Sequence, residues 1–351
     1  MGLFENMLSG NESLFLNEVV LDFDYIPKLF KYRENDQKYI AECIKPLFNN
    51  RDGRNLFVYG SQGIGKSACI KVVLRELQEK SDINCIYVNC WKFNTSFKVI
   101  SEICSLIGYK WVHNKRTDEL LDASSKILNK EGSVIILDEA DKLEEQEIIY
   151  SLLEDLDKKC IFLITNNSEF LIKLDTRIKS RLRADMIEFK PYNKIETEGI
   201  LRQRMEFAFV KDIFDEEGFS KIVDKTFNLE DMRIGLFLMK ESGERAENDS
   251  SKKILLKHVD ESLKNLDKFM LKDKLEVGDT KILEIIKENS GKSIGSLFEI
   301  YQKNNGDVGY KTFSRRIKDL EKAGLISTKE IVKNGKTRIV EYGVMKKLEE
   351  F

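Results

Sequence analysis

A glycine-rich turn between an apolar run and a helical pattern constrains this chain more than any other feature. Residues 56–59 (LFVY) are apolar, and the motif Gly-x-x-x-x-Gly-Lys-Ser follows at residues 60–67. Apolar side chains then recur at helical spacing, at Ile70, Val73, Leu74 and Leu77. A strand, a glycine loop and a helix in this order are typical of a phosphate-binding loop, because glycines let backbone N–H groups curl round the anion. The alternative is a chance glycine turn before a helix.

The residue types in this loop suit a nucleoside triphosphate. We expect Lys66 to reach the β- and γ-phosphates and the Ser67 hydroxyl to hold Mg²⁺. The helix N-terminus adds a favourable dipole for the bound anion. The predicted nucleotide-binding residues of this segment are Gly60, Ser61, Gln62, Gly63, Ile64, Gly65, Lys66, Ser67 and Ala68.

Two carboxylates follow a second buried strand. Residues 134–137 (VIIL) are apolar, and Asp138 and Glu139 come directly after them. Ligands of open α/β sheets bind outside the carboxyl ends of the strands. We therefore expect Asp138 to support Mg²⁺ through water, and Glu139 to orient or deprotonate the attacking water. A strand that ends in Asp-Glu is weak evidence alone and becomes strong when a phosphate loop precedes it.

Two further segments carry polar groups that suit phosphoryl transfer. Asn166 follows the apolar run 161–165 and can hold the attacking water or the γ-phosphate, although Asn-Asn is also a common strand-end turn. Residues 174–183 (LDTRIKSRLR) are rich in arginine, which stabilises charge on a transferring phosphoryl group, often from a neighbouring subunit. We predict catalytic roles for Arg177 and Arg181, with a basic surface as the alternative.

The strand patterns stop at Pro191 and give way to helices. Helical patterns lie at about 193–207, 215–225, 229–246 and 254–267. Arg233, in the first turn of the third helix, could swing toward a nucleotide or lie on the surface. Nearer the N-terminus, Asp36 is predicted to cap a helix that begins at Gln37. Residues 268–280 are charged and lack a pattern, which predicts a linker.

The C-terminal part has the pattern of a winged helix-turn-helix. Apolar positions within 282–286, 294–301 and 313–320 predict three helices, residues 325–332 and 337–342 predict two strands, and Asn334-Gly335 predicts the turn between them. Residues 281–351 hold 15 Lys and Arg against 10 Asp and Glu, whereas the whole chain has a net charge of −2. We expect this domain to bind duplex DNA, or alternatively a protein. The predicted DNA contacts are Lys311, Thr312, Arg315, Arg316, Lys318, Lys333, Lys336 and Arg338.

Other features narrow the classes of protein. The six cysteines form no C-x-x-C pair and His113 and His258 stand alone, so buried thiols are expected rather than a zinc site. No apolar stretch reaches transmembrane length and no signal-peptide pattern is present, so we expect a cytoplasmic, nucleoid-associated protein with no membrane partner. Residues 108–118 (GYKWVHNKRTD) are either a solvated loop or a helical insertion that touches DNA.

Taken together, these motifs resemble those of the AAA+ replication initiators of the origin-recognition-complex and cell-division-cycle family, in their archaeal form. The similarity runs from about Leu21 to Tyr342. It lies in the order and spacing of short segments that read DYIP, YRENDQ, VYGSQGIGKSA, YVNC, IILDEAD, LITNN, LDTRIKSRL, FKPY, ILRQRMEFAF and LEDMRIGLFLMKESGERAE.

The resemblance implies a bound ATP or ADP and further site residues. It implies that Asn166 is the first sensor and Arg233 the second. It implies that Tyr192 and Arg204 lie against the nucleotide from the lid side. It also implies that Ile26, Tyr32 and Arg33 form a wall beside the adenine. The segment 105–120 falls where the family carries an initiator-specific insertion.

The fold class expected is α/β, with an AAA+ P-loop parallel sheet, an all-helical lid and a C-terminal winged helix. The predicted domains are the arm and ATPase base at 1–190, the lid at 191–270 and the winged helix at 278–351. The predicted function is ATP-dependent binding of replication-origin DNA, with weak ATPase activity as a switch. The resemblance also implies recruitment of the MCM helicase and contact with other initiator subunits. The alternatives are a clamp-loader-type ATPase and an ATP-sensing winged-helix transcription regulator.

Overall fold

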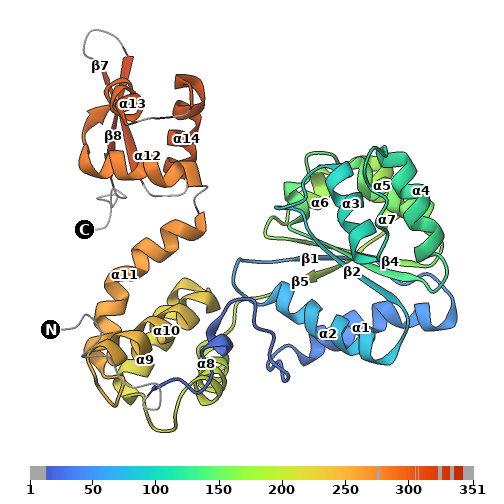
Figure 1. The fold of residues 1–351 in the computed structure, drawn as a ribbon, viewed down its shortest axis with the longest axis horizontal. Helices are drawn as coiled ribbons and strands as arrows, with labels where there is room; N and C mark the ends of the chain where they lie inside the picture. Colours follow the sequence, from blue (N-terminus) through green and yellow to red (C-terminus); the bar gives the residue numbers. More distant parts are fainter. Residues whose placement is uncertain are drawn as a thin grey trace. The chain divides into compact units, whose positions relative to one another are not determined.

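The computed structural model describes residues 13–274, 277–304, 306, 308–322, 326–332 and 336–342. The chain forms two compact units, Met1–Asp260 and Glu261–Phe351 (Figure 1). The first unit contains a parallel sheet and a separate group of helices, and the second contains helices and a small antiparallel sheet. Within these described ranges no helix has the length and apolar character needed to cross a membrane.

A five-stranded sheet forms the base of the first unit. Its strands are β1 Leu56–Tyr59, β2 Asn84–Asn89, β3 Ser133–Asp138, β4 Lys159–Thr165 and β5 Asp185–Glu188, in the order β2-β3-β4-β1-β5. All neighbouring strands are parallel. Side chains alternate along a strand, so β3 sends Val134 and Ile136 into one apolar cluster and Ile135 and Leu137 into another. Burial on both faces explains why this strand reads as an unbroken apolar run.

Helices cover both faces of the sheet (Figure 1). One face packs against α1 Glu34–Ile44 and α2 Lys66–Lys80. The other face packs against α3 Ser96–Leu106, α4 Thr117–Leu128, α5 Glu147–Asp155, α6 Phe170–Lys173 and α7 Thr176–Leu182. Short 3₁₀ helices occur at η1 Glu18–Leu21 in the N-terminal arm, η2 Lys45–Asn49 and η3 Ala140–Lys142.

The strand order brings the carboxyl ends of β1, β3 and β4 to one edge. Tyr59 of β1 is in register with Thr165 of β4, and Asp138 of β3 is in register with Ile164 of β4. The loop after β1, the carboxylates after β3 and the residue after β4 therefore meet there, where open α/β sheets bind ligands.

The remaining helices of the first unit form the lid. They are α8 Lys194–Ala208, α9 Glu216–Leu229, α10 Met232–Asn248 and the start of α11 Leu256–Lys274. The N-terminal arm packs on this group, because the Leu16 amide donates to the Ala208 carbonyl at 2.8 Å and the Phe15 and Phe209 rings lie 4.7 Å apart. The contact requires glycine at position 243, since a Cβ there would lie 2.4 Å from Phe15.

The second unit is a three-helix core with a β-hairpin. Its elements are α12 Val277–Glu288, β6 Lys292–Ser293, α13 Ile294–Lys303, α14 Tyr310–Lys322, β7 Ile326–Val332 and β8 Lys336–Tyr342. The strands pair antiparallel in the order β6-β8-β7. Tyr301, Phe313 and Val340 are fully buried in its core. The predicted winged-helix pattern is confirmed, while the predicted turn at Asn334-Gly335 lies outside the described residues.

Two local predictions are wrong. The linker at 268–280 is largely helical, because α11 runs to Lys274 and α12 begins at Val277, and Lys and Leu favour helix even without an apolar stripe. Helix α1 begins at Glu34, so Asp36 lies in its first turn, where a carboxylate favours the helix dipole, and does not cap it. Of the two alternatives left open for residues 108–118, the structure shows the loop, because residues 107–116 form no helix. Tyr109 and Val112 pack on the core, and Trp111 is 78% exposed.

Candidate functional site

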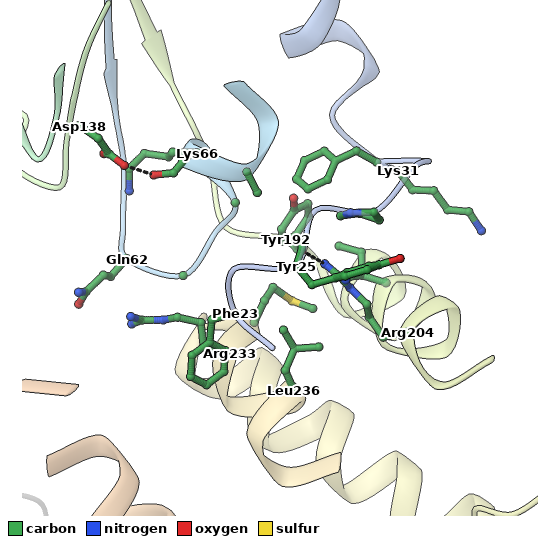
Figure 2. A pocket seen from close by; sticks show the side chains of 18 of the residues that line it. Phe23, Tyr25, Lys31, Gln62, Lys66, Asp138, Tyr192, Arg204, Arg233 and Leu236 are labelled. Atoms are coloured by element: carbon green, nitrogen blue, oxygen red, sulfur yellow. Dashed lines mark hydrogen bonds between the residues drawn. The ribbon is translucent and has the colours of Figure 1, made fainter. Parts of the chain in front are cut away.

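A cavity of about 250 Å³ lies at the carboxyl edge of the sheet in the first unit (Figure 2). Three parts of the chain line it. The base contributes Gln62, Gly63, Gly65, Lys66, Ser67, Ala68, Asp138, Glu139, Thr165 and Asn166. The N-terminal arm contributes Phe23, Tyr25, Pro27, Phe30 and Lys31. The lid and the segment leading into it contribute Tyr192, Ile200, Gln203, Arg204, Met232, Arg233 and Leu236.

The glycine loop adopts a backbone that other residues rarely adopt. Gly60, Gly63 and Gly65 have φ values of 148°, 71° and 88°. Gly65 directly precedes α2, so the loop delivers Lys66 and Ser67 at the helix N-terminus. This is the geometry in which free backbone N–H groups and the helix dipole attract an anion.

Lys66 is held by oxygen atoms of the base. Its Nζ donates to the carbonyls of Gly60 at 2.9 Å and Ser61 at 2.7 Å, and to Oδ1 of Asn166 at 2.7 Å. Burial lowers the pKa of Lys66 to about 8. A buried ammonium group that is solvated by three oxygens can exchange some of them for oxygens of an anion. The base therefore brings the Lys66 ammonium and the Asn166 amide oxygen together in the cavity lining.

Asp138 is the centre of a second group of bonds. Its Oδ2 accepts hydrogen bonds from the Ser67 hydroxyl at 2.7 Å and from the Tyr87 hydroxyl, and its Oδ1 accepts from the Glu139 amide at 2.9 Å. Burial and the neighbouring Asp138 raise the pKa of the Tyr87 phenol, which stays a donor. A hydroxyl and a carboxylate are hard oxygen ligands, so Ser67 and Asp138 fit Mg²⁺, which takes few protein ligands beside phosphate and water.

Glu139 lines the same wall in a strained conformation. Its φ of 54° places it in the left-handed region, which turns the chain sharply after β3. Burial, and then the charge of Asp138, raise the pKa of the Glu139 carboxyl. A carboxylate with a raised pKa therefore lines the same cavity as Lys66.

The sequence reasoning missed Tyr87. It lies on β2, where Tyr87 is in register with Ile136 of β3, and it packs against the apolar cluster on the α2 side of the sheet. The only signal in the sequence is a hydroxyl within an otherwise apolar run, and that signal does not reveal which carboxylate the hydroxyl meets.

The arm residues predicted beside the adenine are not in the cavity lining. Arg33 is buried, and its Nη2 donates to the carbonyls of Ile64 at 3.3 Å and Lys190 at 2.5 Å, while its guanidinium lies 4.3 Å from the Tyr192 ring. Arg33 thus ties the glycine loop to the segment that leads into the lid. Ile26 and Tyr32 are also absent from the lining among the described residues, where Phe23, Tyr25 and Phe30 stand instead.

Arg204 connects the lid to the arm at the edge of the cavity. Its guanidinium donates to the carbonyls of Val20 at 3.1 Å and Tyr25 at 3.3 Å, and it lies 5.0 Å from the Tyr25 ring (Figure 2). Burial lowers the pKa of Arg204. The arm segment that carries Tyr25 is therefore fixed to α8 by a buried charge. Tyr192 also lines the cavity, and a Cβ on Gly65 would lie 3.0 Å from its hydroxyl.

Comparison with known proteins identifies the family that has this architecture. Residues 50–172 match the AAA domain, and residues 198–264 match the Cdc6 AAA+ ATPase-type lid domain. The chain is 30% identical to ORC1-type DNA replication protein 1 of Archaeoglobus fulgidus, over 96% of this chain and 90% of that protein. The chain belongs to the family of ORC1-type DNA replication proteins.

Solved structures agree with this assignment of the ORC1-type chain. The Aeropyrum pernix ORC1 protein in complex with DNA superposes with a TM-score of 0.80 at 25% identity, over 94% of each chain. CDC6P from Pyrobaculum aerophilum has the same fold, with a TM-score of 0.66 at 17% identity over 95% of each chain. The expected family, the AAA+ α/β fold and the helical lid are confirmed.

Two predicted arginines of the ORC1-type chain lie away from its own cavity. Arg177 is exposed and paired with Asp175 at 3.2 Å, and it borders a hollow beside Glu147 and Tyr150. Arg181 forms an ion pair with Glu154, and its guanidinium lies 5.1 Å from the Tyr150 ring. Within the part of the chain that the structure describes, neither arginine lines the cavity.

Five of the eight predicted DNA contacts of the second unit, Lys311, Thr312, Arg315, Arg316 and Lys318, lie on α14, while Lys336 and Arg338 lie on β8. A shallow hollow on this helix is lined by Tyr310, Lys311, Thr312, Ser314, Arg315 and Lys318. Lys311, Arg315 and Lys318 are exposed, while Arg316 and Arg338 are partly buried. Lys333 and the Lys336 side chain lie outside what the structure describes.

Proposed function

We propose that this ORC1-type protein binds ATP with Mg²⁺ in the cavity of its first unit and binds duplex DNA at replication origins through its second unit. The convergence of Lys66, Asn166, Ser67 and Asp138 at one sheet edge carries the first part. The glycine loop would surround the phosphates, and the aromatic residues of the arm would cover the adenine ring.

The residues of the base divide the work of hydrolysis. Lys66 and Asn166 would bind the γ-phosphate, and Glu139 would orient the attacking water and take its proton. Mg²⁺, held by Ser67 and through water by Asp138, would neutralise charge on the phosphates. We expect slow turnover, so that ATP and ADP define two conformations of the protein.

A neighbouring molecule would complete the site. Arg177 and Arg181 lie on the surface of the base, where an arginine can reach a phosphate bound by a second subunit. Other initiator subunits are the partners that this arrangement suits. Recruitment of the MCM helicase is part of the same proposal.

The DNA part of the proposal rests on charge and shape. Lys311, Arg315 and Lys318 are exposed on the third helix of a winged-helix unit, which is the helix that enters the major groove in such folds. The relative solved with DNA at a TM-score of 0.80 supports the same use of this chain. A clamp loader would need a helical collar here, and the sheet β6-β8-β7 disfavours that alternative.

A salt titration tests the DNA proposal. We expect duplex affinity to fall steeply with salt, and Arg315→Ala to lower the slope of log affinity against log salt by about 1 as one phosphate contact is lost. Arg54→Ala is the matched control, because Arg54 is an exposed cation of the base that pairs with Asp185. A flat salt titration of the parent protein would contradict DNA binding.

Chromosomal footprints decide which DNA is bound. An initiator is expected to protect sites at replication origins. Protection confined to promoters would instead support the transcription regulator, and single-turnover ATP assays without hydrolysis would support the same alternative.

A further inference from the structure

Asp231 holds the arginine that the lid points into the cavity. It caps α10 by accepting a hydrogen bond from the Arg233 amide at 3.0 Å. Its carboxylate also accepts from Nε of Arg233 at 3.0 and 3.2 Å and from Nη2 at 2.5 Å. The two side chains are only 13% and 25% exposed, so water weakens this charge-assisted pair less than it weakens a surface pair.

The Asp231 carboxylate also lies in close contact with the glycine loop. A Cβ on Gly63 would lie 1.9 Å from Oδ1 of Asp231, and the Met232 amide donates to the Gly63 carbonyl at 3.1 Å. The group that holds Arg233 therefore lies at the tip of the loop that would surround the phosphates. Figure 2 shows Arg233 extending from the lid toward the side of the cavity where Gln62 lies.

A second Asp-x-Arg pair on the base provides a comparison. Asp175 caps α7 by accepting from the Arg177 amide at 2.7 Å, and it accepts from Nε and Nη2 of Arg177 at 3.2 and 3.3 Å. Arg177 and Asp175 are 77% and 44% exposed, and neither lines the cavity. The local sequence therefore creates the pair, while the fold places only the Asp231 pair beside the loop.

We propose that Asp231 is a specificity-determining residue, which sets the preference of the site for a nucleoside triphosphate over a diphosphate by competing with the γ-phosphate for Arg233. The inference rests on the proposed nucleotide site and deepens it. A guanidinium fork binds a carboxylate or a phosphate through the same N–H groups. The γ-phosphate must draw Arg233 away from Asp231, whereas a diphosphate, which lacks that group, leaves the pair intact.

The test compares Asp231→Asn with the parent protein. Asn keeps an oxygen that caps α10 and removes the charge that holds Arg233. With Mg²⁺ present, dissociation constants are measured for ADP and for a non-hydrolysable ATP analogue. We expect the preference for the ATP analogue to rise about tenfold or more, which is the lower end of what one charge-assisted hydrogen bond contributes. Asp175→Asn, with the same chemistry at the other cap, is expected to leave the preference unchanged at concentrations where the protein is monomeric, because Arg177 then meets no neighbour's phosphate.

A second background shows whether Arg233 transmits the effect. In Arg233→Ala protein, Asp231→Asn is expected to leave the preference unchanged, because no arginine is there to be released. Equal tightening of both nucleotides, an unchanged preference, or a gain that persists without Arg233 would each overturn the inference. Asp231→Ser, which also caps helices, gives the same readout if the Asn variant folds poorly. A parent protein that binds neither nucleotide would contradict the proposed function itself.

Discussion

The two walls of the cavity are built in different ways. On the base, the polar side chains bind one another and the backbone from which they come, as Lys66 does with Gly60 and Asn166, and Ser67 with Asp138. On the opposite wall, Arg204 is held by carbonyls of the N-terminal arm, which is distant in sequence. The base is therefore assembled by one sheet, and the opposite wall exists only while the arm and lid stay packed.

This difference suggests that the base wall serves ATP hydrolysis, while the wall formed by the arm and lid responds to which nucleotide is bound. A wall fixed by strand ends keeps its donors and acceptors at hydrogen-bonding distance whatever the lid does. A wall fixed by an arm can open or close as one body, and its position can report which nucleotide is bound. Base variants should therefore change binding and hydrolysis directly, and variants of the opposite wall should change affinity and stability together.

Among substitutions that leave nucleotide binding intact, we expect the largest effect from Glu139 of the ATPase base, and we expect it on ATP hydrolysis. Glu139→Gln removes the carboxylate that would take the proton from water and keeps its size. We expect the single-turnover rate of ATP hydrolysis to fall by about 100-fold or more, with ATP affinity within about threefold of the parent value. If the variant hydrolyses ATP at the parent rate, Glu139 does not act as the general base that takes the proton from water.

A substitution of Arg204 tests the wall of the cavity that the arm and the lid form. Arg204→Ala leaves the buried carbonyl of Val20 and the partly buried carbonyl of Tyr25 without a charged donor, so we expect the free energy of unfolding to fall by about 2–3 kcal/mol. We also expect ATP affinity to fall about tenfold as Tyr25 loosens. Denaturant unfolding and nucleotide titration measure the two effects.

A neighbour on the same helix serves as the control for Arg204. Arg202 pairs with Glu198 and Glu216 at the surface, and its removal is expected to cost at most about 1 kcal/mol and to leave ATP affinity unchanged. Equal effects of the two substitutions would mean that the arm contact of Arg204 has no special part in the site.

The smallest effect expected concerns the thiols, all six of which lie in the base. Burial raises the pKa of Cys43 to about 11 and that of Cys90 to about 12, above the value of about 8.5 in an unfolded chain. The folded state therefore disfavours thiolates, so stability is retained below about pH 8.5 and declines as pH rises above it.

Thiol labelling shows whether the base stays closed when the lid wall is loosened. At pH 8 we expect slow modification of Cys43 and Cys90, at the same rate in the parent and in Arg204→Ala protein, measured by mass spectrometry. Faster labelling in the variant would show that base and lid open as one unit, contrary to the distinction between the two walls.

The same distinction explains what the sequence could reveal. The glycine loop and the carboxylates after β3 follow apolar strand runs directly, so local pattern placed Lys66, Ser67 and Asp138 at one edge. The arm residues Phe23 and Tyr25 line the cavity, and Tyr25 is held there by Arg204 of a distant helix. No local pattern encodes such a contact.

Other misses have the same physical origin. The Tyr87 bond to Asp138 depends on the pairing of two strands, and β5 Asp185–Glu188 is a short edge strand with charged ends that carries little apolar signal. Residues 268–274 lack an apolar stripe yet continue α11, because helix propensity suffices there.

The central claim is that the glycine loop binds a nucleoside triphosphate through Lys66. Calorimetric titration with ATP and Mg²⁺ tests it most directly, with Lys66→Ala compared with the parent and with Lys80→Ala, an exposed lysine at the end of the same helix that pairs with Glu76. The account predicts that Lys66→Ala abolishes detectable binding and that Lys80→Ala binds as the parent does. ATP binding by Lys66→Ala as tight as that of the parent would contradict it.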